Sequence, residues 1–579
     1  MTGAKRRQEG ERGVWVNPET YIVEGAEGNA LTRRPHLLSE PPNRQGLPGA
    51  RAHIETPRER TEQERPIGNR GKAGLGERGE TGAPWGERPV GVGLSHSSEE
   101  PGEGGGKLTS GRSEGESRAG SPAEGERTHT QRWHSLFPEL RRVEEVARRK
   151  PEAKFTSLAH YLTVALLEKA YEALEADAAP GVDGVTKKEY GRDLERNLKE
   201  LHERLKTGRY RAKPVLRRWM EKPDGGQRAL GIPAVEDKIV QGAVVEILNS
   251  IYEADFYGFS YGYRPGRSAH QALRALQTVL QKGQVSWVLD ADISRFFDTT
   301  DHRQLMAVIR RRVVDRSLLR LIGKWLAVGV VEEDGRREDS RKGTPQGGVI
   351  SPVLANIFLH EVVDVHVHEW RKTKARGEVY VIRYADDLVL AAEYEEDAGE
   401  LLKELEGRLE RYGLSLNREK TRVIRFGRKP GSGTFDFLGF THMAGKDRQG
   451  RYLVIRKTAC KRLNRSLKAI GVWCKKYRHR PLEWQCRELG RKLVGHYNYY
   501  GIRGNFKSLG RFYNRAWMAW WRSLRRRSQK ANVQRLKELL TKVFILPKPR
   551  ITHLEGWLSV NPGDLLGRAG CGNAACPDL

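Results

Sequence analysis

Two adjacent aspartates interrupt an otherwise apolar stretch of the chain. Asp386 and Asp387 lie between the runs VYVIR and LVLAA, which predict two strands joined by a tight turn. Neighbouring carboxylates repel each other, so packing gives no reason for the pair. Polar residues are nevertheless common in turns, and a plain hairpin tip remains the alternative interpretation. The pair alone only suggests metal chemistry.

A third carboxylate, Asp292, ends the apolar segment QVSWVLDAD, which predicts a buried strand over 284–292. In an antiparallel sheet this strand end can lie beside the hairpin tip. Asp292 and Asp386 would then bind hard divalent cations through oxygen. Two such ions could activate an attacking hydroxyl and stabilise a leaving phosphate. Asp292 could instead be a helix N-terminal carboxylate, and Asp290 and Asp298 are rival candidates.

A glycine-rich loop precedes a predicted helix in GTPQGGVISPVLANIFLH. Ser351 is expected to cap this helix and Pro352 to occupy its first position. A loop of this kind brings backbone amides close to a phosphate or a base pair. Many loops share the pattern, so it is a weak signal by itself.

Two cations, Lys222 and Arg228, flank the turn Pro-Asp-Gly-Gly at 223–226. Together they could neutralise a triphosphate. The alternative is that both are simply solvated, as most cations on hairpins are.

The elements that would position these side chains follow from hydrophobic periodicity. Helices are predicted over 133–150, 155–174, 190–208, 235–252, 268–281 and 396–413. Two strands are predicted within 210–233, one over 284–292, a hairpin over 377–393 and a strand over 414–427. Helices that alternate with short strands over about 230 residues indicate a mixed α/β domain.

Residues 1–130 differ from the rest of the 579-residue chain. They contain 24 of the 63 Gly and 11 of the 26 Pro, and little apolar surface. Such a segment cannot offset its ordering entropy by burial, so it is predicted to be a disordered tail. An RNA-binding role for the tail is the alternative, although its charges are mixed rather than basic.

The net charge of +29 favours a polyanionic partner, and most of it lies in residues 461–550. That region has 25 Lys and Arg against three acids, interleaved with thirteen aromatic residues. We favour nucleic-acid contact there over a helical bundle with solvated basic faces. No run of 18 apolar residues predicts a membrane span, the charged N-terminus does not resemble a secretory signal, and five cysteines suggest a reducing compartment.

Several motifs, taken in order, resemble the reverse transcriptases encoded by bacterial and organellar group II introns, called maturases. The matching segments are EKPDGGQRALGIPAVEDKIVQ, FYGFSYGYRPGRSAHQAL, LDADISRFFDTTDH, GTPQGGVISPVLANIFLHEVVD, RYADDLVL, LNREKT and FDFLGF. The resemblance covers residues 133–445, with a looser helical continuation to about 550. Gln-Gly-Gly followed by Ser-Pro-x-x-Ala-Asn favours this family over retron and diversity-generating reverse transcriptases.

The resemblance implies an α+β fold of the right-handed polymerase type: fingers, a palm with an antiparallel sheet, and an α-helical thumb. The expected divisions are a disordered tail (1–130), an N-terminal extension and start of the fingers (131–200), fingers and palm (201–445), a thumb and maturase-specific RNA-binding domain (446–550) and a C-terminal tail (551–579).

The resemblance also assigns roles to individual residues. Asp292, Asp386 and Asp387 match the palm carboxylates; Asp292 and Asp386 would bind two Mg²⁺ ions with the backbone carbonyl of Ile293. Lys222 and Arg228 match the cations that hold nucleotide phosphates, Phe297 the aromatic that excludes a ribose 2′-hydroxyl, and Gln346 a nucleotide-contacting glutamine. RNA contacts are expected from Arg491, Lys492, Arg515, Arg522, Arg525, Arg526 and Arg527.

The function implied is RNA-directed DNA synthesis, with binding of the host intron RNA, assistance to its splicing and copying of the intron during mobility. Expected partners are intron RNA, target DNA, primer and dNTPs, in a ribonucleoprotein of the bacterial cytoplasm without a membrane; a homodimer is left open. A splicing-only maturase with a vestigial polymerase, and a reverse transcriptase adopted for host defence, are the alternatives.

Two departures from the family pattern bear on these expectations. Ala229 stands where relatives usually have Pro. Many relatives carry a C-terminal endonuclease with paired cysteines and histidines, whereas only Cys571 and Cys576 occur near this C-terminus. No DNA endonuclease is therefore expected, and insertion would need another primer source.

Overall fold

The structure is a computed structural model that describes residues 137–221, 226–338, 342–344, 346–428, 431–527 and 532–553. The strands are β1 (Val215–Glu221), β2 (Gln227–Ile232), β3 (Trp287–Asp292), β4 (Val330–Val331), β5 (Arg337–Glu338), β6 (Val379–Tyr384), β7 (Asp387–Ala392), β8 (Arg422–Arg425), β9 (Thr434–Phe437), β10 (Phe440–Lys446) and β11 (Tyr452–Thr458).

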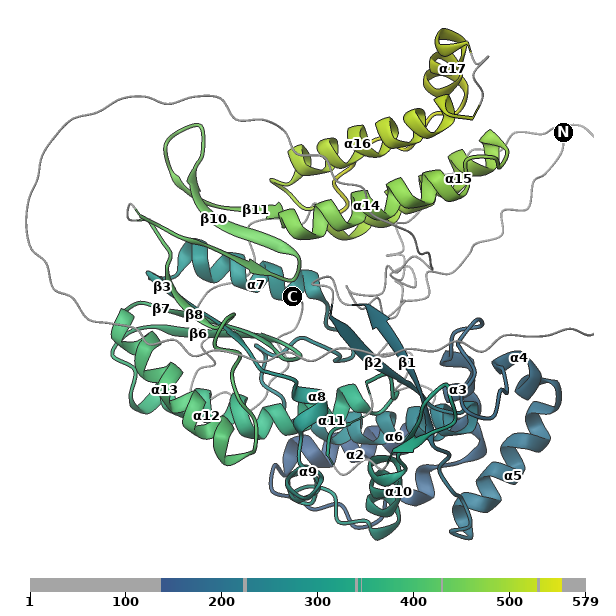
Figure 1. Ribbon diagram of the computed structural model, residues 1–579. Helices are drawn as coiled ribbons and strands as arrows, with labels where there is room; N and C mark the ends of the chain where they lie inside the picture. The colour runs from purple at the N-terminus through teal and green to yellow at the C-terminus, as the bar shows by residue number, and fades with distance from the viewer. Residues whose placement is uncertain are drawn as a thin grey trace, which may run out of the picture. The chain divides into compact units, whose positions relative to one another are not determined.

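The helices precede, separate and follow these strands along the chain (Figure 1). They are α2 (Pro138–Arg149), α3 (Val164–Ala173), α4 (Lys187–Tyr190), α5 (Leu194–Lys206), α6 (Val235–Tyr252), α7 (Ala269–Lys282), α8 (Phe296–Thr299), α9 (His302–Ile309), α10 (Arg316–Ala327), α11 (Ser351–Leu359), α12 (Val365–Thr373), α13 (Glu395–Arg411), α14 (Cys460–Lys476), α15 (Leu482–Tyr500), α16 (Phe506–Arg525) and α17 (Val533–Glu538). Short 3₁₀ turns are η1 (Ala159–Tyr161) and η2 (Gly191–Asp193), and π turns are η3 (His360–Asp364) and η4 (Leu539–Val543).

An antiparallel sheet of order β6-β7-β3-β8 forms the centre of the described residues. Its two inner strands, β3 and β7, are mostly apolar and buried, as expected for strands covered on both faces. Alternate residues point to opposite sides: Leu289 packs with the leucines of α13, whereas Val288 packs with the apolar face of α7. The α+β class expected from the sequence is therefore confirmed.

The described residues contain two further sheets. Strands β2-β1-β4-β5 form a four-stranded sheet, of which β1 and β2 precede β3 in the chain while β4 and β5 follow it. Strands β9, β10 and β11 form an antiparallel sheet whose last strand contacts α7. Helices α14, α15 and α16 follow and share a separate core around Trp520 and Phe512. The β10–β11 hairpin, which periodicity did not predict, spans the boundary expected at 445/446.

The predicted helix over 155–174 is too long by its first nine residues. Phe155 instead forms a β-bridge with Val313, and the carboxylate of Asp315 accepts hydrogen bonds from the backbone amides of Leu158 and Ala159, at 2.6 and 2.9 Å. The helix α3 begins only after Thr163, whose hydroxyl caps it. A tertiary contact therefore replaces the first helical turns.

Two further predictions are wrong in detail: the length of the strand expected over 414–427, and the cap of the helix that follows the glycine-rich loop. Only Arg422–Arg425 form a strand, and the preceding residues form a loop with a single bridge between Leu416 and Ile293. Ser351 is the first residue of α11 rather than its cap, a position held by Ile350.

Three expectations fall outside the described residues. The tail 1–130, Lys222 with its turn, and the terminal cysteines belong to segments that the structure does not describe. Among the described helices, none combines the length and the apolar character that crossing a bilayer requires.

Candidate active site at the end of the central sheet

The register of the central sheet places Asp292 directly opposite Asp387. β3 and β7 pair antiparallel from Trp287↔Ala392 through to Asp292↔Asp387. Directly paired residues share one face of a sheet, so two carboxylates separated by 95 positions become cross-strand neighbours. Asp386 precedes Asp387 in the turn between β6 and β7. Like charges paired in this way destabilise a sheet unless a cation lies between or beside them.

The turn that carries Asp386 has a strained backbone. Ala385, its first central residue, has φ = 56°, a left-handed conformation that costs a residue with a side chain about 1 kcal/mol. Gly262 lies tightly against the turn, because a Cβ added there would come within 2.3 Å of the Ala385 amide nitrogen. Backbone strain held by close packing is typical of functional turns.

The loop before β8 fixes the end of β3. The backbone amide of Asn417 donates to the carbonyl of Asp292 at 2.8 Å, and Thr421 accepts from the Asp292 amide at 3.3 Å. The same loop brings the Lys420 ammonium 3.0 Å from Oδ2 of Asp292. Both side chains are partly open to solvent, and the ammonium offsets part of the negative charge that gathers here.

These oxygen donors suit a hard divalent cation. Within the described ranges, no three His, Cys, Asp or Glu side chains converge into a complete metal cluster. Mg²⁺ sites often use one or two carboxylates and complete their coordination with water and substrate phosphates. The paired Asp292 and Asp387, with Asp386 adjacent, match such a substrate-completed site.

The rival Asp290 lies on the same face, two residues before Asp292. Burial raises the pKa of Asp290 to about 6, Arg422 opposes the rise, and the charges of Asp292 and Asp436 add to it. Arg422 lies 3.7 Å away, so Asp290 already has a cationic partner. The other rival, Asp298, is exposed on α8.

The expected nucleotide-binding residues come from three segments that backbone hydrogen bonds join. The Gly231 amide, three residues after Arg228 on β2, donates to the carbonyl of Gln346 at 2.5 Å. The Thr344 amide donates to the carbonyl of Phe297 at 2.7 Å. The loop around Gln346 therefore ties β2 to α8, although the structure does not describe Lys222.

The basic region, residues 461–550, has its seven expected RNA-binding cations at the surface. Arg491, Lys492, Arg515, Arg522, Arg525, Arg526 and Arg527 are all exposed or partly exposed. Trp517 and Trp521 lie in parallel at 6.2 Å, and the Arg525 guanidinium covers the Trp521 ring at 4.9 Å. Flat aromatic and guanidinium surfaces of this kind can stack on nucleic-acid bases.

Two residues near the site, Lys420 and Arg383, were not predicted from the sequence. Lys420 occurs in LNREKT, where nothing marks one lysine among several charges. Arg383 carried a usable signal, because an arginine inside the apolar run VYVIR is expected to be buried and therefore paired.

Comparison with known protein families shows which class of enzyme this chain belongs to. Residues 220–442, which hold the paired carboxylates and the glycine loop, match the family model described as reverse transcriptase (RNA-dependent DNA polymerase). The chain is thus an RNA-directed DNA polymerase with a palm-type antiparallel sheet, and it works on nucleic-acid templates. Enzymes of this family generally depend on divalent metal ions.

Individual relatives narrow the class. The chain is 35% identical over 326 residues to Protein YkfC of Escherichia coli, a match that covers 50% of this chain and 83% of that protein. It is 35% identical over 225 residues to the Group II intron-encoded protein LtrA of Lactococcus lactis, covering 38% of this chain and 37% of that one. Nuclear intron maturase 4 of Arabidopsis thaliana is 27% identical over 155 residues, 27% of this chain and 19% of that protein.

The chain therefore belongs to the reverse transcriptases encoded by group II introns, the maturases. The family match supports reverse transcription.

Proposed function

We propose that this protein copies its host group II intron RNA into DNA with Asp292, Asp386 and Asp387 as the catalytic carboxylates. The observation that carries the proposal is the pairing of Asp292 with Asp387 at the end of the central sheet, one residue from Asp386. Two Mg²⁺ ions, when bound, would activate the primer 3′-hydroxyl and neutralise the phosphates of the incoming dNTP.

Each residue has a defined part in this proposal. Asp292 and Asp386 bind the metal ions at the strand end, with the backbone carbonyl of Ile293, and Asp387 is the third acid. Arg228, Gln346 and the undescribed Lys222 bind the nucleotide. Their common support is the hydrogen bond between Gly231 and Gln346, which couples β2 to the glycine loop.

Phe297 selects deoxynucleotides in this proposal. Its backbone carbonyl is held by Thr344, and its ring packs edge-on against Phe296 with centroids 5.3 Å apart. A ring fixed by this contact can exclude a ribose 2′-hydroxyl by its bulk.

The basic region binds the host intron RNA and assists its splicing, in a bacterial cytoplasmic ribonucleoprotein that also engages target DNA and primer. The support is the position of its seven named cations at the surface and the stacked Trp517 and Trp521. The match with LtrA spans 37% of the length of that protein.

Primer extension on an RNA template in Mg²⁺ tests the catalytic assignment. Asp386→Ala should lower the rate of synthesis by several orders of magnitude while primer-template binding in a gel-shift assay stays within about twofold, since the basic region is unchanged. Glu396→Gln is the matched control, because Glu396 is an exposed acid just beyond the opposite end of β7. Undiminished synthesis by Asp386→Ala would overturn the assignment.

A splicing-only maturase with a vestigial polymerase predicts a different pair of results. Splicing of the parent intron at low Mg²⁺ would be accelerated by the wild-type protein, and no DNA would be made on any template. The intact carboxylates favour the polymerase, because Asp292 and Asp387 repel each other across the two strands and would have no reason to be kept together without a cation to bind.

A further inference from the structure

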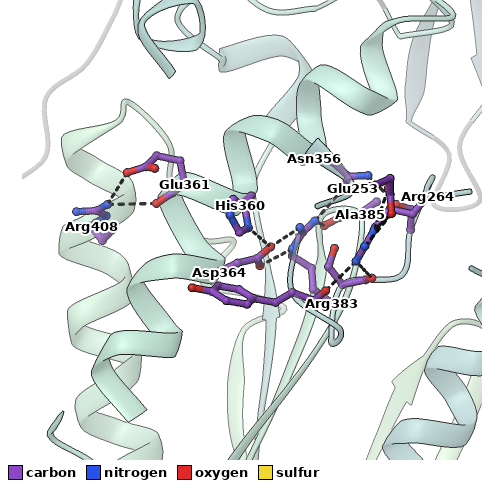
Figure 2. A network of polar contacts seen from close by, with 12 residues as sticks. Glu253, Arg264, Asn356, His360, Glu361, Asp364, Arg383, Ala385 and Arg408 are labelled. Carbon is purple, nitrogen blue, oxygen red and sulfur yellow. Dashed lines mark hydrogen bonds and ion pairs between the residues drawn. The ribbon is translucent and has the colours of Figure 1, made fainter. Parts of the chain in front are cut away.

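Arg383 is a fully buried arginine in the strand that leads into the catalytic turn. Its side chain is 1% exposed and forms a two-pronged ion pair with Asp364, from Nε to Oδ1 at 2.7 Å and from Nη2 to Oδ2 at 2.6 Å. Nη1 donates to Oδ1 of Asn356 at 2.9 Å. Figure 2 shows the guanidinium between these two partners and Ala385.

The same guanidinium also holds the turn itself. Nη1 of Arg383 donates to the backbone carbonyl of Ala385 at 3.1 Å, and Ala385 is the residue with the left-handed backbone. Asp386, which follows, can keep its place only if Ala385 keeps its conformation. Arg383 therefore links the buried Asp364 to the strained residue that precedes the proposed metal ligand.

A second set of contacts holds the turn from the other side. The backbone of Arg383 exchanges hydrogen bonds with Phe259 and Tyr261, both at 2.9 Å, and Nδ2 of Asn356 donates to the carbonyl of Gly262 at 2.7 Å. Gly262 in turn packs on the peptide before Ala385. Asn356 thus bonds to both sides of the turn, through the guanidinium and through this loop.

A π turn brings the partners of Arg383 onto one side of their helix. Asn356 lies on α11 and Asp364 ends the π turn η3, eight residues later. Residues eight apart on an uninterrupted α-helix are about 80° out of phase. The wider π turn absorbs part of this offset, and such turns occur frequently at functional sites.

Stability alone does not account for this arrangement. Asp364 is fully buried, and burial would by itself raise its pKa, but the charges and hydrogen bonds of Arg383 and His360 together lower it. A buried ion pair often gives no more stability than apolar residues of the same size, because both charges lose their hydration. What it does supply is a rigid, directional frame, since the arginine fork accepts only one geometry.

We propose that Arg383, Asp364 and Asn356 are positioning residues that fix the Ala385 turn and thereby the metal-binding geometry of Asp386 and Asp387. The inference rests on the proposed function, in which those two aspartates act on the metal ions. None of the three positioning residues contacts substrate; each acts through the turn.

The test replaces Arg383 by lysine, which keeps the charge but loses the fork. Arg383→Lys should lower the turnover of single-nucleotide incorporation by about 10- to 100-fold, as misplaced reacting groups do. The KM for dNTP and the Kd for primer-template should stay within about twofold, because the glycine loop and the basic region are untouched. Direct Mn²⁺ binding, measured by electron paramagnetic resonance on a complex with a dideoxy-terminated primer, should weaken by a similar factor.

Arg312→Lys is the matched control. Arg312 is also buried, is paired with Asp255 at 3.0 Å and donates to backbone carbonyls near Lys150, away from the central sheet. The Arg312→Lys variant should have a lower free energy of unfolding in urea, with no change in turnover per folded molecule or in Mn²⁺ binding. If Arg383→Lys matched this control in both readouts, the positioning role would be excluded.

Gly262→Ala perturbs the turn without touching the ion pair, and it decides the matter if Arg383→Lys does not fold. The added methyl group would meet Ala385 and should reproduce the loss of turnover and of Mn²⁺ binding. Gly258→Ala, in the same loop with open space around it, should do neither. Wild-type behaviour of Gly262→Ala would overturn the inference.

The two proposals fail separately. Synthesis by Asp386→Ala would refute the catalytic assignment itself. An inactive Asp386→Ala together with fully active Arg383→Lys and Gly262→Ala would leave that assignment intact and refute only the positioning role.

Discussion

At the scale of single residues, the central feature of the site is the repulsion between closely placed carboxylates. Asp292 and Asp387 are paired across two strands, and Asp290 lies on the same face. Lys420 and Arg422 approach this face with positive charge, at 3.0 Å from Asp292 and 3.7 Å from Asp290. The protein therefore concentrates acids where a folded chain would ordinarily separate them, which is the condition for binding cations.

Asp290 should make the folded protein less stable as the pH rises. Its pKa is raised, mainly by burial, to about 6, against about 3.9 for an unfolded chain. The folded state thus holds the proton more tightly, so stability is highest below about pH 4 and is lost as the pH rises through 6. Asp290→Asn should flatten this dependence. Between pH 4 and pH 7.5, the wild type should lose about 1 to 2 kcal/mol more free energy of unfolding than this variant loses.

Urea denaturation between pH 4 and 8 measures this effect. Asp334→Asn is the control, since Asp334 is an acid in the exposed turn between β4 and β5. Equal pH slopes for the wild type and Asp290→Asn would show that Asp290 titrates normally.

At the scale of elements, the glycine loop connects parts that are distant in sequence. Gly347 has φ = 109°, and a Cβ there would come within 2.5 Å of the Gly231 carbonyl on β2. The close approach allows the hydrogen bond from Gly231 to Gln346. Glycine is required at this position both for its backbone conformation and for its lack of a side chain.

Gly347→Ala should therefore weaken nucleotide binding. A shift of the loop worth about 1.4 kcal/mol would raise the KM for dNTP about tenfold, while primer-template affinity stays the same. Steady-state single-nucleotide incorporation measures the KM, and a gel-shift assay measures the affinity. Gly335→Ala is the matched control, because Gly335 has φ = 85° but open space around it. An unchanged KM in Gly347→Ala would separate the loop from nucleotide binding.

At the scale of the whole molecule, charge is distributed very unevenly. The net charge is +29, and residues 461–550 carry +22 of it. Helices α14 to α16 pack through an aromatic core and leave most of their cations outside. Self-repulsion on this scale favours a polyanionic partner, as expected for a protein that binds RNA.

Affinity for RNA should consequently depend steeply on salt. If six or more phosphates are neutralised, Kd should rise by about 10³-fold or more between 50 and 200 mM salt. Replacing Arg522, Arg525 and Arg526 by alanine should lower the slope of log Kd against log salt by about one for each phosphate that no longer has a cationic partner. Arg196→Ala, an exposed arginine on α5 paired with Glu200, is the control. A flat salt response would contradict nucleic-acid binding by this region.

Some features of this protein follow from the sequence alone. Two apolar runs separated by polar turn residues predict the β6–β7 hairpin, and helical periodicity predicts α6 with both ends correct. The order of the motifs identifies the family without any coordinates. These signals are local, since the type of an element depends on residues within a few positions of one another.

Tertiary structure alone decided how the acids meet and what holds them. The register Asp292↔Asp387 depends on hydrogen bonds between strands, which no spacing in the chain specifies. The ion pairs of Lys420 with Asp292 and of Arg383 with Asp364 join segments that lie far apart or on different elements. Burial and pairing result from packing among all the elements together, so the geometry of this site exists only in the folded chain.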